Sequence, residues 1–111
     1  MSQEISTAAL EKQAEEKKVL GNAAMAAKEY GEAIRCYSEA LELSAAGPSS
    51  HIYYSNRAAA HCFFENYERA AEDCEAAIRL RVDFAKAYSR LGLCNFYLGR
   101  HKESVAAYER G

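Results

Sequence analysis

The chain repeats itself with a period of about 34 residues, and this repetition restricts its fold more than any other feature. The string YSNR at 54–57 returns at 88–91 as the related string YSRL. A slightly longer offset relates Tyr30 to Tyr67, and the three extra residues fall in a Gly- and Pro-containing loop, SAAGPSSH. A unit of this length cannot bury its apolar face alone. The repetition therefore predicts units that stack into one continuous core.

Each unit has two helical halves. Within the second unit, residues 52–64 and 67–80 carry apolar side chains at three- and four-residue spacing, with a short break at 65–66 between them. Half of the chain is hydrophobic and only one proline is present, a composition that favours helices over sheets. Small residues at matching positions mark close helix contacts: Ala33, Ala40, Ala70, Ala77 and Gly92.

A helix–turn–helix unit of about this length resembles the tetratricopeptide repeat. The motif residues that carry the resemblance are Leu20, Gly21, Tyr30, Ala33, Tyr37 and Ala40, then Tyr54, Tyr67, Ala70, Cys74 and Ala77, then Tyr88, Leu91, Gly92, His101 and Tyr108. The proline that often closes each repeat is displaced to Pro48 in the first repeat and replaced by Val82 in the second. The resemblance implies an all-α fold, in which antiparallel helix pairs stack as a right-handed solenoid with a concave peptide groove.

The resemblance also divides the chain. We expect an N-terminal extension at 1–13, either helical or a disordered tail, and a first repeat with a loop insertion at 14–50. A second repeat follows at 51–84 and a truncated third repeat at 85–111. Because the chain stops inside the third repeat, we expect a fragment of a longer protein. Its last helix is expected to be frayed, or completed by another copy.

Lys86 and Arg90 lie four residues apart, so in a helix these two like charges repel on one face. In a stack of helix pairs, the first helices of successive repeats line up on the inner wall, and residues one period apart become neighbours. This wall would gather three cations and two amides: Lys18, Asn22, Asn56, Lys86 and Arg90. Charge-assisted hydrogen bonds to a carboxylate would relieve the repulsion. The pattern therefore predicts a receptor for an acidic peptide.

This constellation is similar to the two-carboxylate clamp of chaperone-binding tetratricopeptide domains, whose five positions all match here. The resemblance implies a partner, the C-terminal Glu-Glu-Val-Asp tail of the 70-kDa and 90-kDa heat-shock chaperones. Met25 and Ala59 are candidates for an apolar pocket that holds the valine of the tail, with core packing as the alternative for each. Phe63 is expected to extend the groove as an apolar shelf. Tyr97 would either contact upstream peptide residues or pack in the core.

Several short strings look most like the small glutamine-rich tetratricopeptide co-chaperones. They are AMAAKEY, SNRAAA, EDCEAAI, KAYSRLG and AAYERG. The resemblance implies a place in the delivery of tail-anchored membrane proteins. The N-terminal dimerisation domain and C-terminal glutamine-rich region of that family are absent here. We therefore expect chaperone docking without client handover, in a parent protein that dimerises through a region outside this chain.

Other function classes find little support in the sequence. The formal net charge of −2 argues against nucleic acid as a partner. No apolar run suits a membrane span or a secretory signal, which favours the cytoplasm.

The four cysteines form no C-x-x-C pair and the histidines do not have the spacing of metal ligands, so we expect buried thiols, no metal and no cofactor. Arg57 is expected to form a structural ion pair, and His61 to lie between helices.

No nucleophile–base arrangement is evident, so we expect no enzyme in these residues. Two alternatives stay open beside the chaperone adaptor. The domain could target a fused enzyme, such as a phosphatase, an isomerase or a ubiquitin ligase, to chaperones. It could instead be a general scaffold that binds another helix in its groove.

Overall fold

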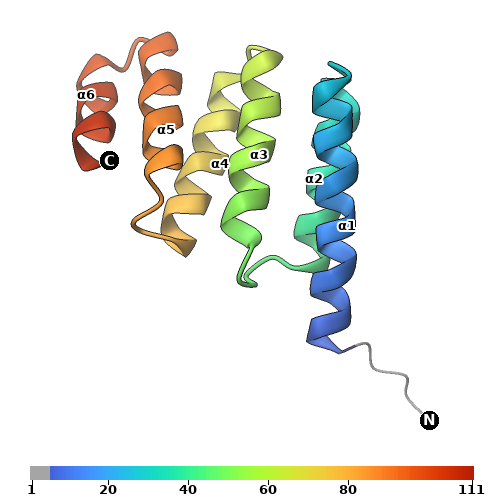
Figure 1. Ribbon diagram of the computed structural model, residues 1–111. Coiled ribbons are helices and arrows are strands. Elements are labelled where there is room, and N and C mark those ends of the chain that lie inside the picture. Colours follow the sequence, from blue (N-terminus) through green and yellow to red (C-terminus); the bar gives the residue numbers. More distant parts are fainter. Residues whose placement is uncertain (1–5) are drawn as a thin grey trace.

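The computed structural model describes residues 6–111, and over that range it contains six helices in a row (Figure 1). The helices are α1 (Thr7–Ala26), α2 (Tyr30–Leu43), α3 (Ser50–Phe63), α4 (Tyr67–Leu80), α5 (Ala85–Tyr97) and α6 (His101–Arg110). Each helix packs against the next one along the chain, and α3 also contacts α5. The predicted fold class, an all-α stack of helix pairs, is confirmed.

The first helix begins with a serine cap. The Ser6 hydroxyl accepts a hydrogen bond from the Ala9 backbone N–H at 3.1 Å, which satisfies one of the free donors at the helix start. From Thr7 onward α1 is continuous, so residues 7–13 belong to the same helix as Lys18 and Asn22. Residues 1–5 of the expected extension lie outside the described residues.

Three sharp turns send the second helix of each pair back along the first. At these turns Lys28, Glu65 and Gly99 have φ values of 61°, 58° and 77°. This left-handed conformation ends α1, α3 and α5, and it is readily adopted only by glycine. The three turns occupy equivalent places in successive repeats, so they follow the periods that the sequence shows.

Small residues let the paired helices approach closely. A Cβ atom on Gly21 would lie 2.5 Å from the Tyr37 ring, and one on Gly92 would lie 2.8 Å from the Tyr108 ring. Several core alanines have no exposed surface at all: Ala14, Ala33, Ala40, Ala58, Ala60, Ala70, Ala77 and Ala87. Small side chains thus fill the helix contacts, as the spacing of Ala33, Ala40, Ala70, Ala77 and Gly92 predicted.

The last helix differs from the sequence-based expectation. α6 is formed to Arg110, so the prediction of a frayed end is wrong. Its inner face is buried at Ser104 and Ala107, and the Ser104 hydroxyl donates to the Gly92 carbonyl at 2.7 Å. Packing against α5 through this bond and the Tyr108 ring holds α6 in place.

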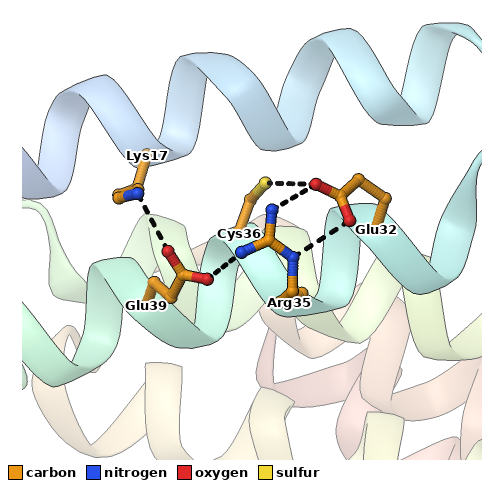
Figure 2. A network of polar contacts seen from close by, with 5 residues as sticks. All are labelled: Lys17, Glu32, Arg35, Cys36 and Glu39. Carbon is orange, nitrogen blue, oxygen red and sulfur yellow. Dashed lines mark hydrogen bonds and ion pairs between the residues drawn. The ribbon is translucent and has the colours of Figure 1, made fainter.

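A polar network lies along the contact between α1 and α2 (Figure 2). Lys17 of α1 pairs with Glu39 of α2 at 2.9 Å. Arg35 bonds both Glu39 and Glu32, and the Cys36 sulfur lies 3.8 Å from a Glu32 oxygen. The network places the Lys17 side chain on the side of α1 that faces α2. Lys18, the next residue, therefore lies on a different face of α1.

The array is elongated, with principal extents of 55 × 30 × 18 Å. In Figure 1, α1 and α6 lie at its two ends, and α3 to α5 lie between them. The first helices of the second and third pairs, α3 and α5, contact each other directly, so these two helices lie side by side.

Candidate peptide-binding groove

Hydrogen bonds link the three first helices at the positions that the sequence singled out. The Asn56 amide of α3 donates to Asn22 Oδ1 of α1 across 3.5 Å. On the other side of α3, the Arg90 guanidinium of α5 donates to the Ser55 hydroxyl at 3.0 Å and to the Ser55 carbonyl at 3.2 Å. Asn22, Asn56 and Arg90 therefore lie along one wall, each one repeat from the next.

The two lysines flank this line one turn earlier on their helices. Lys18 is half-buried, and its ammonium pairs with the Glu15 carboxylate at 2.8 Å. Lys86 is exposed, and within residues 6–111 the structure shows no hydrogen bond or ion pair for it. The structure thus brings Asn22 and Asn56 into contact and holds Arg90 against Ser55, the residue before Asn56. Lys18 and Lys86 share their face without contacting the amides.

Two contacts of these residues were not anticipated from the sequence. The Tyr37 hydroxyl of α2 donates to Asn22 Oδ1 at 2.5 Å, and Ser55 holds Arg90. A tyrosine hydroxyl is neutral at physiological pH, and burial raises the pKa of Tyr37 further, to about 12. The Glu15–Lys18 pair was detectable in principle, because the two residues are three apart on one helix.

An apolar cavity of about 290 Å³ opens beside Arg90. Its lining comes from α3, the start of α4 and α5: Ala59, Cys62, Phe63, Tyr67, Arg90, Leu93 and Tyr97. Phe63 stacks on Tyr30 and Tyr97 stacks on Tyr67, each with ring centroids 4.6 Å apart. Both outer rings stay well exposed, at 61% for Phe63 and 57% for Tyr97. The cavity therefore combines a cation with accessible aromatic surface.

The predicted pocket residues divide between this cavity and the core. Ala59, Phe63 and Tyr97 line the cavity. Met25 is half-buried and packs against the core cluster around Ala24 and Tyr37, outside the cavity lining. Met25 and Ala59 therefore do not line one common cavity.

Arg57, next to Asn56, points to a different side of α3, as expected. It donates to both carboxylate oxygens of buried Asp73 on α4, at 2.9 and 2.8 Å, and to the Ser38 hydroxyl at 3.1 Å. His61 Nε2 lies 3.8 Å from Asp73, and burial lowers the pKa of His61 below its usual 6.5. The structural ion pair and the interhelical histidine are confirmed.

All four cysteines are free thiols. Cys36, Cys74 and Cys94 are buried, as predicted, whereas Cys62 is only half-buried. Cys62 and Cys94 bring their sulfur atoms within 3.6 Å of each other between α3 and α5. The contact with Cys94, together with burial, raises the pKa of Cys62 well above its usual range. Across residues 6–111, no group of His, Cys, Asp and Glu side chains is arranged to hold a metal ion. None of the helices described is long and apolar enough to cross a membrane.

The stacked helix pairs define a helical-repeat domain, and comparison with known proteins agrees with this fold. Family models described as tetratricopeptide repeat match residues 14–45 and 85–111. The chain belongs to the tetratricopeptide repeat family.

Two curated relatives are similar to this chain. The small glutamine-rich tetratricopeptide repeat-containing protein 2 of Mycosarcoma maydis is 46% identical over 98 residues, which is 88% of this chain and 27% of the relative. Serine/threonine-protein phosphatase 5 of Homo sapiens is 40% identical over 98 residues, which is 88% of this chain and 19% of the relative. The chain spans about a quarter of the length of the small glutamine-rich relatives it matches.

Two solved structures are also similar. The first tetratricopeptide domain of Spaghetti (RPAP3), bound to the HSP90 peptide SRMEEVD, has a TM-score of 0.86 at 31% identity; the match covers 90% of this chain and 77% of that one. The Sgt2 domain from Aspergillus fumigatus has a TM-score of 0.81 at 44% identity; the match covers 87% of this chain and 62% of that one.

Proposed function

We propose that this chain is a docking module that binds the acidic, free C-terminal tail of the 70-kDa and 90-kDa heat-shock chaperones. The tail of the Glu-Glu-Val-Asp type would lie along the wall formed by α1, α3 and α5. The proposed carboxylate-binding residues are Lys18, Asn22, Asn56, Lys86 and Arg90. The Spaghetti domain, solved with such a peptide, supports this assignment because it shares the fold over most of both chains.

One observation carries the proposal. The contact between Asn22 and Asn56 and the bond between Arg90 and Ser55 align donors from three helices on one wall. Lys86, one turn before Arg90, is exposed and available to an anion. Carboxylates accept hydrogen bonds only, so a wall of amide, ammonium and guanidinium donors suits them.

The expected affinity follows from these donors. Each charge-assisted hydrogen bond contributes about 1.5–3 kcal/mol. A ligand carboxylate must replace Glu15 on Lys18 and compete with Ser55 for Arg90, which reduces the net gain. After the cost of ordering the peptide, we expect a dissociation constant of roughly micromolar size.

The cavity beside Arg90 is proposed to hold an apolar side chain upstream of the acidic end. Its volume of about 290 Å³ and its exposed Phe63 and Tyr97 rings suit an unbranched or branched aliphatic group. Ala59 forms part of the same wall. Met25, which packs toward the core, would contact the tail only at its exposed edge.

The larger setting is also a proposal. Similarity to the relative named heat-shock protein cognate co-chaperone sgt12 supports a co-chaperone adaptor. We further propose that this adaptor acts in the cytoplasm, in tail-anchored protein delivery, and without catalysis by this chain. We propose that the chain is divided into an N-terminal extension (1–13), a first repeat with a loop insertion (14–50), a second repeat (51–84) and a truncated third repeat (85–111). The phosphatase relative supports an alternative, in which the same kind of domain targets a fused enzyme.

Calorimetric titration with the peptide Met-Glu-Glu-Val-Asp tests the proposal. The free acid should bind, whereas the C-terminally amidated peptide and the double variant Lys86→Ala, Arg90→Ala should bind at least about 30-fold more weakly. The matched control is Arg79→Ala, Lys102→Ala, which removes the same charge from exposed sites on α4 and α6. Equal binding of acid and amide, or equal loss in the control variant, would refute the clamp.

A further inference from the structure

The Tyr37 hydroxyl reaches Asn22, a proposed groove residue on α1, although Tyr37 belongs to α2, a helix outside the proposed groove wall. Only 1% of the residue is exposed, and its ring lies against Gly21. Its hydroxyl donates to Asn22 Oδ1 of α1 at 2.5 Å. A core side chain thus reaches a residue that the proposed function uses.

The Asn22 oxygen is engaged from two directions. Besides the Tyr37 hydroxyl, the Asn56 amide donates to it across 3.5 Å. A side-chain amide has one acceptor oxygen and an NH₂ group with two donors. Because the oxygen is held by the protein, the Asn22 NH₂ group is left for an outside acceptor, and the side chain is exposed to receive one.

We propose that Tyr37 is a positioning residue, which fixes the orientation of the Asn22 amide so that the groove presents a donor to the ligand. The inference rests on the proposed function. Without the hydroxyl, the amide can turn over and present its oxygen, which repels a carboxylate. Tyr37 therefore helps to select acceptor-only groups, such as a peptide carboxylate, over neutral amides.

The environment of Tyr37 suits this role. The hydroxyl is neutral at physiological pH and can donate, and burial keeps its pKa above the ordinary value, at about 12. Gly21 makes the placement possible, because a Cβ atom at that position would collide with the ring. The ring is thus fixed by the contact between α1 and α2, and its hydroxyl is fixed with it.

A purely structural role predicts a different pattern. If Tyr37 used Asn22 only to satisfy its own hydroxyl, removing the hydroxyl would change stability and leave ligand affinity alone. The Asn22 oxygen is at an exposed residue, so water can replace the lost bond. The two roles are therefore separable by comparing binding with unfolding.

The test is titration of Tyr37→Phe with the free-acid peptide Met-Glu-Glu-Val-Asp, beside urea unfolding of the same variant. We expect binding about 3- to 10-fold weaker with a nearly unchanged unfolding midpoint. In an Asn22→Ala background, Tyr37→Phe should have no further effect on binding. The matched control is Tyr88→Phe, which loses a buried hydroxyl that donates to the Val82 carbonyl at 2.6 Å, and which should bind like the wild type.

The outcomes separate the two proposals. If the wild type does not bind the free acid, the proposed function fails. If the wild type binds and Tyr37→Phe binds equally well, or if Tyr37→Phe still weakens binding in the Asn22→Ala background, the positioning role is overturned. If Tyr37→Phe does not fold, NMR of the wild-type complex decides. A Tyr37 hydroxyl proton close to the Asn22 side chain supports the role, and its absence contradicts it.

Discussion

Lys17 and Lys18 are neighbours in the sequence, yet they serve different faces of α1. Lys17 pairs with Glu39 of α2, in the network of Figure 2. Lys18 pairs with Glu15 along the helix and shares the face of Asn22, four residues on. Successive residues on a helix lie about 100° apart, so one charge supports the helix pair and the other is available to the groove.

This pair supplies a matched test at the residue scale. Lys18→Ala should weaken binding of the free-acid peptide about 10-fold, because one charge-assisted bond is lost and Glu15 is left near the ligand. Lys17→Ala removes the same charge one residue away and should leave the affinity within about 2-fold of the wild type. Titration of both variants with the free-acid peptide tests this difference. An equal loss of affinity in the two variants would show that the net charge of the domain, and not a specific contact of Lys18, governs binding.

The sequence alone was sufficient to propose the five groove residues, since the repeat period places Asn22, Asn56 and Arg90 on one wall. It was not sufficient to find the contacts that orient them. Tyr37 has the spacing of a core aromatic residue of the repeat. That spacing does not show which residue its hydroxyl contacts. Ser55 next to Asn56 carries no signal until the crossing of α3 and α5 is known.

At the scale of elements, the pairing of helices depends on small residues of one helix that pack against aromatic rings of the next. The predicted break at 65–66 agrees with the end of α3 at Phe63 and the start of α4 at Tyr67. The predicted fraying of the last helix was wrong because the burial of Ser104 and Ala107 was not anticipated. Periodicity finds the helices well, but a short terminal helix depends on its tertiary contacts.

Gly92→Ala should therefore destabilise the α5–α6 pair. The new Cβ would lie 2.8 Å from the Tyr108 ring, and such overpacking costs about 1–3 kcal/mol. Gly31→Ala is the control, because its Cβ would lie 3.6 Å from the Phe64 ring, an ordinary contact. This variant should be neutral, or stabilising by up to about 1 kcal/mol. Urea unfolding of both variants tests the contrast, and equal effects would contradict it.

At the scale of the whole molecule, the groove and the core should respond differently to salt. The groove contacts are charged and solvent-accessible, so they are screened. Raising the salt concentration from about 0.05 to about 0.5 M should weaken free-acid peptide binding on the order of 10-fold. The free energy of unfolding should change by less than about 1 kcal/mol, because exposed ion pairs contribute little. Binding that is insensitive to salt would contradict an ionic groove.

Two histidines, buried His51 and half-buried His61, make stability depend on pH. Burial lowers the pKa of both His51 and His61 below 6.5 in the folded chain, and Arg81 adds to the effect at His51. The unfolded chain therefore takes up protons first, near pH 6.5. The free energy of unfolding should be at its full value above that pH and fall as the pH drops toward the folded pKa values. The slope is at most about 1.4 kcal/mol per pH unit for each histidine.

Urea unfolding at pH 7.5, 6.5 and 5.5, together with NMR titration of the His61 ring, checks this dependence. The ring should titrate with a midpoint below 6.5. A midpoint above that value, or stability that rises on acidification through this range, would show that the Asp73 carboxylate outweighs burial at His61.

The most direct measurement of the central claim is the NMR response of the asparagine side-chain amides to the free-acid peptide. The chain has four asparagines, of which Asn22 and Asn56 lie in the groove. Asn66 precedes α4 and Asn95 is buried in α5, so both serve as internal controls. The NH₂ signals of Asn22 and Asn56 should shift strongly with the free acid and little with the amidated peptide, while those of Asn66 and Asn95 stay in place. Unmoved groove amides in the presence of a bound peptide would show that the ligand lies elsewhere on the molecule.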